Sequence, residues 1–164
     1  TYGFGGAIEW KGFDVSIFFQ GTARVSLFEE GSTIVPFSSG YKNNDGFLRG
    51  VMENRWTVDN PDPNARYPRT IRPRDALDNN NTKKSSFWVR NAAFLRLKNA
   101  EIGYTFPKRW MEKMAIQNLR LYVSGVNLLT WAPDVHLFDP DLGSGDGRKY
   151  PPTRVFNVGL NINF

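Results

Sequence analysis

The chain of 164 residues contains no cysteine and a single histidine, His136. The lack of cysteine excludes a disulfide framework, a cysteine-ligated zinc site and a thiol nucleophile. One histidine also makes a conventional zinc enzyme a poor match, because such sites draw most of their ligands from histidine and cysteine. We therefore expect no metal and no cofactor.

Long apolar runs are also missing. The mean hydropathy is −0.45, and no stretch has the ~20 apolar residues of a transmembrane helix. A transmembrane β-strand needs only about 9 to 11 residues of alternating character, so it leaves average hydropathy low. The chain starts at Thr1 without the charged and apolar segments of a signal peptide, so we expect a removed leader or an internal segment.

Charge favours one other class of protein. The net charge is +5, which invites a nucleic-acid-binding interpretation. The arginines, however, gather in a proline-rich polar stretch and form no periodic basic face; they include Arg66, Arg69, Arg72 and Arg74. Nucleic acid is therefore not expected as a partner, and a basic nucleic-acid-binding domain is kept as the second alternative.

What the chain does contain is aromatics, 15% of residues, with 15 glycines and 10 prolines, a mix that favours strands and turns. Lys11-Gly12 predicts a tight hairpin turn, because glycine tolerates a positive φ. Leu95 and Leu97 fall out of the alternating phase, which indicates a bulge or the point where a strand leaves a bilayer. Period-two alternation predicts five strands, at about residues 2–10, 13–21, 94–106, 119–131 and 154–164.

The last strand shows the pattern best. Its apolar residues alternate with asparagine and glycine, and asparagine is a poor strand former. Such a strand needs one apolar and one aqueous environment, which a lipid face and a polar lumen supply. The predicted lumen-facing residues are Asn157, Asn161 and Asn163. The predicted lipid-facing residues are Phe156, Val158, Leu160, Ile162 and Phe164.

Strand lengths and connections together predict an all-β fold: an antiparallel up-and-down transmembrane β-barrel, of which this chain supplies about five strands. Short connections at residues 11–12 and 108–118 alternate with long ones at 22–91 and 132–152. Outer-membrane barrels have short periplasmic turns and long external loops, so the C-terminus is placed in the periplasm. The predicted periplasmic aromatic girdle consists of Trp10, Phe13, Tyr104, Phe106 and Trp110. The first alternative is a soluble carbohydrate-binding β-sandwich.

Two charged residues need separate treatment. If Ala100 faces lipid, period two carries Arg96 and Lys98 onto the same face at headgroup height. This predicts contact with lipopolysaccharide phosphates. The alternative is that both point inward after a phase change.

The loops offer few candidates for chemistry. Adjacent Glu29 and Glu30 point apart on an extended chain, so no glycosidase pair is expected, and no catalytic residue is assigned. The acidic loop departs from EF-hand spacing and favours a solvated turn over a cation site; its aspartates are Asp139, Asp141 and Asp146. The loop aromatics are expected to anchor the loop rather than to stack on sugar; they are Trp56, Tyr67 and Trp88.

Four segments carry a family resemblance: NRWTVDNPDPNARYPR (54–69), SSFWVRNAAFLRLKNAEIGYTFP (85–107), NLRLYVSGVNLLTW (118–131) and YPPTRVFNVGLNINF (150–164). Together they resemble the closing part of the SusC/RagA-type TonB-dependent outer-membrane transporters.

The resemblance implies that residues 1–164 form the C-terminal part of a barrel of about 22 strands in a Gram-negative outer membrane. It implies a plug domain and a TonB box N-terminal to this chain, energy from the TonB complex, and a SusD-like surface lipoprotein. The implied substrates are oligosaccharides or peptides. It also implies that barrel-assembly machinery reads the final apolar row, which is Phe156, Val158, Leu160, Ile162 and Phe164.

Overall fold

The computed structural model describes residues 1–31, 34–35, 48–70, 80–110, 116–145 and 147–164. The chain divides into two compact units. We call the first the sheet unit; it comprises Thr1–Arg24, Ala93–Pro133 and Pro152–Phe164. The second, the loop unit, comprises Val25–Ala92 and Asp134–Pro151.

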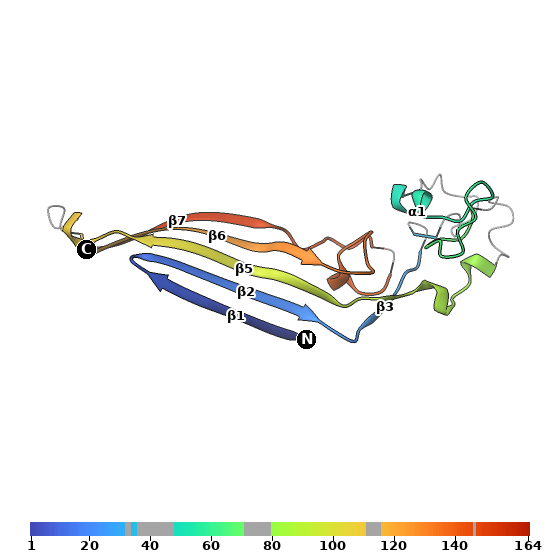
Figure 1. Cartoon of the computed structure of the whole chain (residues 1–164), viewed down its shortest axis with the longest axis horizontal. Coiled ribbons are helices and arrows are strands. Elements are labelled where there is room, and N and C mark those ends of the chain that lie inside the picture. Colours follow the sequence, from blue (N-terminus) through green and yellow to red (C-terminus); the bar gives the residue numbers. More distant parts are fainter. Residues whose placement is uncertain (32–33, 36–47, 71–79, 111–115, 146) are drawn as a thin grey trace. The chain divides into compact units, whose positions relative to one another are not determined.

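The sheet unit is one antiparallel sheet in the order β1-β2-β5-β6-β7, so strands consecutive within the unit are neighbours (Figure 1). The five predicted strands are all present. Their bounds are Tyr2–Trp10 for β1, Phe13–Thr22 for β2, Phe94–Thr105 for β5, Asn118–Trp131 for β6 and Val155–Asn163 for β7.

The hairpin between β1 and β2 closes through a two-residue turn, as predicted. Lys11 has a φ of 49° and Gly12 a φ of 88°. Two consecutive positive φ values match the twist of paired strands and hold them in register. The Gly12 carbonyl also accepts a 2.7 Å hydrogen bond from the Thr105 amide, so the turn is tied to the end of β5.

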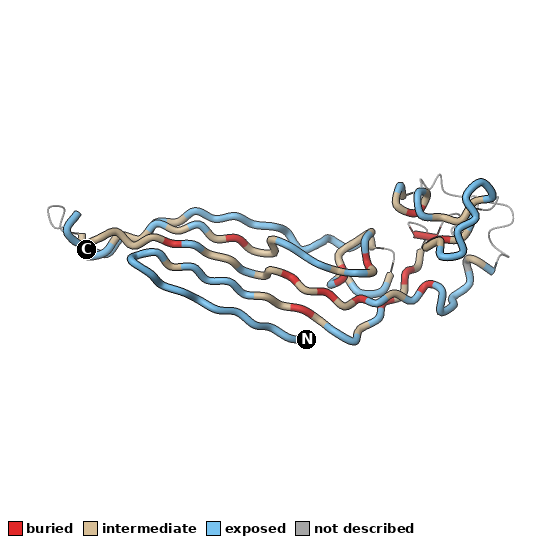
Figure 2. The backbone as a smooth tube through the Cα atoms, in the orientation of Figure 1, coloured by how far each residue is buried: buried red, intermediate tan, exposed pale blue. Residues whose placement is uncertain are grey.

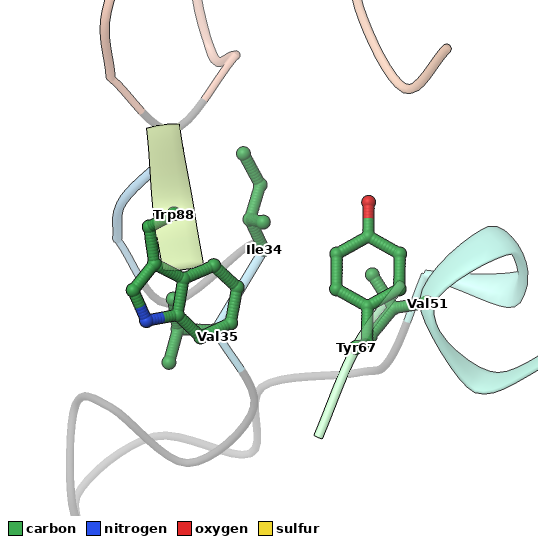
Figure 3. Packing of buried hydrophobic residues seen from close by; sticks show 5 residues of the cluster. All are labelled: Ile34, Val35, Val51, Tyr67 and Trp88. Carbon is green, nitrogen blue, oxygen red and sulfur yellow. The ribbon is translucent and has the colours of Figure 1, made fainter. Parts of the chain in front are cut away.

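The loop unit corresponds to the long connections predicted at 22–91 and 132–152, and it contains some regular structure. It contains a small sheet of β3 (Ser26–Phe28) paired with β4 (Val89–Asn91), and the short helix α1 (Arg49–Glu53). Two hydrophobic clusters hold it together. The first consists of Ile34, Val35, Val51, Tyr67 and Trp88 (Figure 3), and the second of Leu27, Ala92 and Val135.

Burial differs sharply between the two units. Among the described residues, every buried hydrophobic side chain except Phe94 lies in the loop unit. The strands of the sheet unit are mostly exposed or intermediate along their length (Figure 2). None of the helices in the described ranges has the length and hydropathy that a membrane-spanning helix needs.

Candidate functional site: the two faces of the sheet

One face of the sheet is apolar on every strand, because residues paired across neighbouring strands point to the same side. Val15 pairs with Ile102, Ile102 with Val123, and Val123 with Val158. We call this the apolar face. Its larger members are Tyr2, Phe4, Ile8 and Trp10 on β1; Phe13, Val15, Ile17 and Phe19 on β2; Leu95, Leu97, Ile102 and Tyr104 on β5; Leu119, Leu121, Val123, Leu129 and Trp131 on β6; and Phe156, Val158, Leu160 and Ile162 on β7.

The apolar face is exposed. Val158 is 75% exposed, Ile8 74% and Phe156 69%. A soluble β-sandwich would bury these side chains against a second sheet, so their exposure counts against that alternative. A contiguous exposed apolar surface marks contact with a membrane or with another protein.

The opposite face, which we call the polar face, carries mainly short, polar and charged side chains, although Phe18, Tyr122, Val126 and Val155 also lie on it. Asn157, Asn161 and Asn163 all lie on it, opposite Ser124, Arg120 and Asn118 of β6. Its other members include Gly3, Gly5, Ala7 and Glu9 on β1; Asp14, Ser16 and Gln20 on β2; and Arg96, Asn99, Glu101, Gly103 and Thr105 on β5. The sheet therefore has the two environments that the last strand requires.

A bulge in β5 keeps Leu95 and Leu97 on the apolar face. Phe18 pairs with Asn99 and Phe19 with Leu97, which leaves Lys98 as an extra residue on β5. The register between β5 and β6 also shifts here, from Leu97–Leu129 to Asn99–Val126. A bulge reverses the alternation beyond it, so residues that are out of phase in sequence rejoin the apolar face. The predicted bulge in β5 is confirmed.

The bulge overturns one prediction. Arg96 pairs with Gln20 and Thr130, on the polar face, and is 1% exposed. Its Nε donates a 2.9 Å hydrogen bond to Thr130 Oγ1. The expected contact of Arg96 with lipopolysaccharide is therefore wrong, because period two does not continue through the bulge. Lys98 occupies the bulge itself, and its predicted contact stays a prediction.

An ion cluster spans three strands of the polar face. Arg120 of β6 donates from Nε to Asp14 Oδ1 of β2 at 3.0 Å, and from Nη2 to Glu101 Oε1 of β5 at 2.6 Å. To reach Asp14 the guanidinium crosses β5 at Gly103. A Cβ on Gly103 would lie only 2.7 Å from Arg120 Nε and 2.7 Å from Asp14 Oδ1. The missing side chain at 103 thus opens the path for the ion pair.

The sequence reasoning missed this cluster. Its signal was available: Asp14, Glu101 and Arg120 are charged residues at polar-phase positions inside predicted strands. Charged residues in membrane-crossing segments generally face an aqueous or protein-filled interior and pair with one another. What the sequence did not supply was the register that brings residues 14, 101 and 120 together.

Aromatic residues gather at the hairpin end of the sheet. Phe13 lies 4.6 Å from Tyr104 between ring centroids, Tyr104 5.0 Å from Phe106, and Phe106 6.0 Å from Trp110. Trp10 is paired with Phe13 across the hairpin. All five predicted girdle residues thus collect at one end of the strands.

The final apolar row lies on an edge strand. Among the described strands, β7 pairs with β6 alone. Val158, Leu160 and Ile162 share its apolar face, and Phe164 follows directly after the strand. Their role as a barrel-assembly signal stays a prediction.

The loop unit is fastened by a buried carboxylate. Glu29 is 0% exposed, and its two oxygens bind Arg66 Nη2 at 3.2 Å and Arg90 Nε at 2.9 Å. Arg66 Nη1 also contacts Asp134 Oδ1 at 2.9 Å, and Asp134 Oδ2 accepts a 2.9 Å hydrogen bond from the Asn91 amide. Segments far apart in sequence are thereby tied together within one unit.

The charges in this network shift one another's ionisation. Burial disfavours the charged carboxylate of Asp134, but the Asn91 amide and Arg66 outweigh it and hold the pKa below its usual value. Burial likewise opposes the charge of Arg66, whose bonds to Tyr67 and Asp134 nevertheless raise its pKa. Burial raises the pKa of the Tyr67 phenol.

The loop aromatics and the acidic loop singled out from the sequence take part in packing and in a turn. Tyr67 and Trp88 are buried in the first cluster, consistent with the anchoring role predicted for them. Asp139 accepts a 3.0 Å hydrogen bond from the Asp141 amide within a turn, and Asp146 lies outside the described residues. In the ranges that the structure describes, no group of three histidine or acidic residues is arranged to hold a metal.

Comparison with known proteins identifies the fold and the family. No family model matches the chain. The chain is 30% identical over 177 aligned residues to TonB-dependent receptor P3 of Formosa agariphila, and 29% identical over 178 to TonB-dependent receptor P26 of the same organism. In fold it matches the RagAB peptide importer in its open-open state, with a TM-score of 0.64, 24% identity and 99% of this chain covered. The RagAB peptide transporter matches with a TM-score of 0.63 and 23% identity over 94% of this chain.

The relatives in sequence and the likeness in fold to RagAB together support a segment of a SusC/RagA-type TonB-dependent receptor. The chain spans only 16–17% of the length of the two Formosa receptors, and 16–17% of the two RagAB chains. The five-stranded sheet of this receptor segment is thus an open part of an antiparallel outer-membrane β-barrel, and the exposed apolar face is the surface expected of such a barrel.

Proposed function

We propose that the chain is the C-terminal stretch of a SusC-like barrel that imports oligosaccharides or peptides across the outer membrane. In this proposal it works with a SusD-like lipoprotein and with the TonB complex, and no residue of the chain is catalytic. The observation that carries the proposal is the two-faced sheet: a continuous apolar face suits lipid, and a polar face suits a lumen. The likeness in fold to the RagAB peptide importer supports the transport class.

The same proposal assigns an orientation. The tight turn at Lys11-Gly12 and the connection after β5 are placed in the periplasm together with Phe164. The loop unit is placed outside the cell. The support is that outer-membrane barrels have short periplasmic turns and long external loops. The aromatic cluster at the hairpin end then forms the periplasmic girdle.

Uptake by the full receptor tests the transport function. Cells lacking the receptor gene are complemented with the intact gene, and uptake of labelled oligosaccharides and labelled peptides is measured with and without a protonophore. We expect energy-dependent uptake of one of these classes, together with co-purification of a surface lipoprotein. Uptake that is unchanged by deletion of the gene, for every substrate of both classes, would overturn the proposal.

Protease accessibility tests the orientation. A cleavage sequence inserted after Asn60, in an exposed part of the loop unit, is expected to be cut by protease added to intact cells. The same sequence inserted between Lys11 and Gly12 is the matched control and is expected to be cut only after the outer membrane is opened. The reverse pattern would contradict the assigned direction.

A further inference from the structure

The loop unit contains a small cavity beside the first hydrophobic cluster, with which it shares Trp88. Its volume is about 170 Å³, and it is lined by Pro68, Asn80, Asn81, Ser85, Phe87 and Trp88. Sites for drug-sized molecules occupy about 300–1,000 Å³, so this cavity is suited to a single ring.

The lining combines two kinds of group. Phe87 presents an aromatic ring that is 43% exposed, and Pro68 adds a second apolar surface. Asn80, Asn81 and Ser85 also line the cavity, and their side chains are of the kinds that both donate and accept hydrogen bonds. None of the lining residues is charged, although the Arg90 guanidinium lies 5.6 Å from the centroid of the Phe87 ring. An apolar surface beside neutral hydrogen-bonding groups matches a sugar ring, which has an apolar C–H face and a rim of hydroxyls.

The aromatic wall is held in place before any ligand arrives. The Trp88 indole N–H donates a 3.1 Å hydrogen bond to the Asn81 carbonyl, and Trp88 is buried in the first hydrophobic cluster. Phe87 packs edge-on against Trp88, with ring centroids 5.1 Å apart and an interplanar angle of 85°. Arg90 donates a 2.6 Å hydrogen bond to the Phe87 carbonyl. A fixed wall loses little conformational entropy on binding, which favours affinity for a small ligand.

We propose that this cavity binds one pyranose ring of a neutral saccharide, with the Phe87 ring against its C–H face and the Asn80 amide and Ser85 hydroxyl on its hydroxyls. This deepens the proposed function, because it rests on the loop unit facing the outside of the cell and on a saccharide as the substrate. A peptide is the competing ligand. The amino terminus and the cationic side chains of a peptide would find no acidic partner among the lining residues, so the lining favours the saccharide.

The test is saturation-transfer NMR on the full receptor in detergent. The probes are the methyl pyranosides of glucose, galactose and mannose, with trialanine as the peptide probe. We expect a transfer signal from the ring protons of at least one pyranoside and none from trialanine. A signal from trialanine alone, or no signal from any pyranoside, would overturn the proposal.

Variants then locate the binding site. Phe87→Ala removes the aromatic surface, and we expect affinity to fall about tenfold, which corresponds to about 1.4 kcal/mol and lies at the upper end of what an aromatic contact contributes. Phe87→Tyr keeps the ring and should retain binding. Asn80→Leu keeps the volume but removes the amide, and guards against a Phe87→Ala receptor that folds poorly. Val58→Ala, an exposed apolar residue of the loop unit outside the lining, is the matched control.

Binding that survives both Phe87→Ala and Asn80→Leu would place the sugar elsewhere and overturn the proposal. The outcome is separable from that of the proposed function. A receptor that transports peptides and binds no pyranoside keeps the transport proposal and loses this one. A receptor that binds a pyranoside at Phe87 but transports nothing keeps this proposal and loses the transport proposal.

Discussion

Gly103 decides whether the polar face can form its ion cluster. Leucine at this position would occupy the space through which the Arg120 guanidinium reaches Asp14, so we expect Gly103→Leu to separate Arg120 from Asp14. Overpacking of this kind costs about 1–3 kcal/mol. The measurement is the temperature at which the purified full receptor loses its folded, heat-modifiable form on a gel.

The matched control for this substitution is Gly6→Leu. Gly6 lies on the apolar face of the same sheet, and a Cβ there would meet nothing within 4 Å. We expect the unfolding temperature of Gly6→Leu to stay close to that of the native receptor. Equal losses in both variants would show that leucine in a strand, and not the blocked ion pair, is responsible.

Adjacent Glu29 and Glu30 provide a second comparison between single residues. Glu29→Gln leaves Arg66 and Arg90 without their buried counter-charge. We expect the loop unit to lose about 2–4 kcal/mol of stability, slightly less than when a fully buried ion pair is broken, because both arginines are partly exposed. Glu30 pairs with Lys84 at the surface, so Glu30→Gln should cost about 0–1 kcal/mol.

Hydrogen exchange measures both variants in the full receptor. The Glu29 amide donates a 2.9 Å bond to the Trp88 carbonyl, so peptides covering residues 26–30 report opening of the loop unit directly. We expect faster exchange there in Glu29→Gln and native exchange in Glu30→Gln. Identical behaviour of the two variants would mean that the buried network does not stabilise the loop unit.

Asp134 makes the stability of the loop unit depend on pH. Its pKa is lower in the folded protein than the ordinary carboxylate value of about 3.9, so the folded state binds its proton less readily. The stability it contributes is therefore present above about pH 4 and is lost as pH falls through the lower folded pKa. Exchange of the Asn91 amide, corrected for its intrinsic rate, should accelerate below this pH.

Asp134→Asn removes that titration, and we expect the acid-induced increase in Asn91 exchange to become shallower. Asp59→Asn, at an exposed loop position, is the control and should follow the native profile. A native acid profile in Asp134→Asn would assign the acid sensitivity to other groups.

At the scale of elements, Lys98 is the extra residue that the bulge in β5 accommodates. Deleting Lys98 would join Leu97 directly to Asn99 and restore unbroken alternation against β2, so Leu95 and Leu97 would keep the apolar face and Arg96 the polar face. No charge would move to a lipid-facing position, where it costs about 2–4 kcal/mol at the bilayer midplane. We therefore expect close to native amounts of folded receptor in the outer membrane.

Lys98→Ala is the control for the deletion, since it removes the side chain but keeps the extra residue. We expect folded receptor at close to native abundance. The measurement for both variants is the amount of heat-modifiable receptor in purified outer membranes. A large loss of folded receptor after deletion, with native amounts in Lys98→Ala, would contradict this expectation and show that the sheet needs the bulge itself.

At the scale of the whole molecule, the assignment of lipid and lumen to the two faces of β7 is open to direct measurement. The chain contains no cysteine, so a cysteine introduced here carries a spin label that is unique within it. We expect labels at Val158→Cys and Leu160→Cys to be relaxed mainly by oxygen, which concentrates in the bilayer. Labels at Asn157→Cys and Asn161→Cys should be shielded from oxygen by comparison.

Alternation of this kind along β7 in the full receptor, embedded in lipid, would agree with an apolar face against hydrocarbon. The four labels serve as one another's controls, because they lie on the same strand within a few residues. Equal oxygen accessibility at 157 and 158 would contradict the two-environment interpretation of the strand.

Much of the sheet could be predicted from sequence because strand periodicity is local. The turn at Lys11-Gly12 and the alternation from Phe156 to Ile162 depend on neighbouring residues alone. The error over Arg96 arose where that locality fails: a bulge is defined by the partner strand, and here the registers of both β2 and β6 change around Lys98.

The sequence by itself determined that five strands alternate, that they are joined by one tight turn and by long connections, and that the last strand has one apolar side. These are properties of consecutive residues. Only the tertiary structure decided which distant residues meet: Arg120 with Asp14 across Gly103, and Glu29 with Arg66 and Arg90. Such contacts depend on strand register and on loop packing, and both are set by the free energy of the folded whole rather than by any one segment.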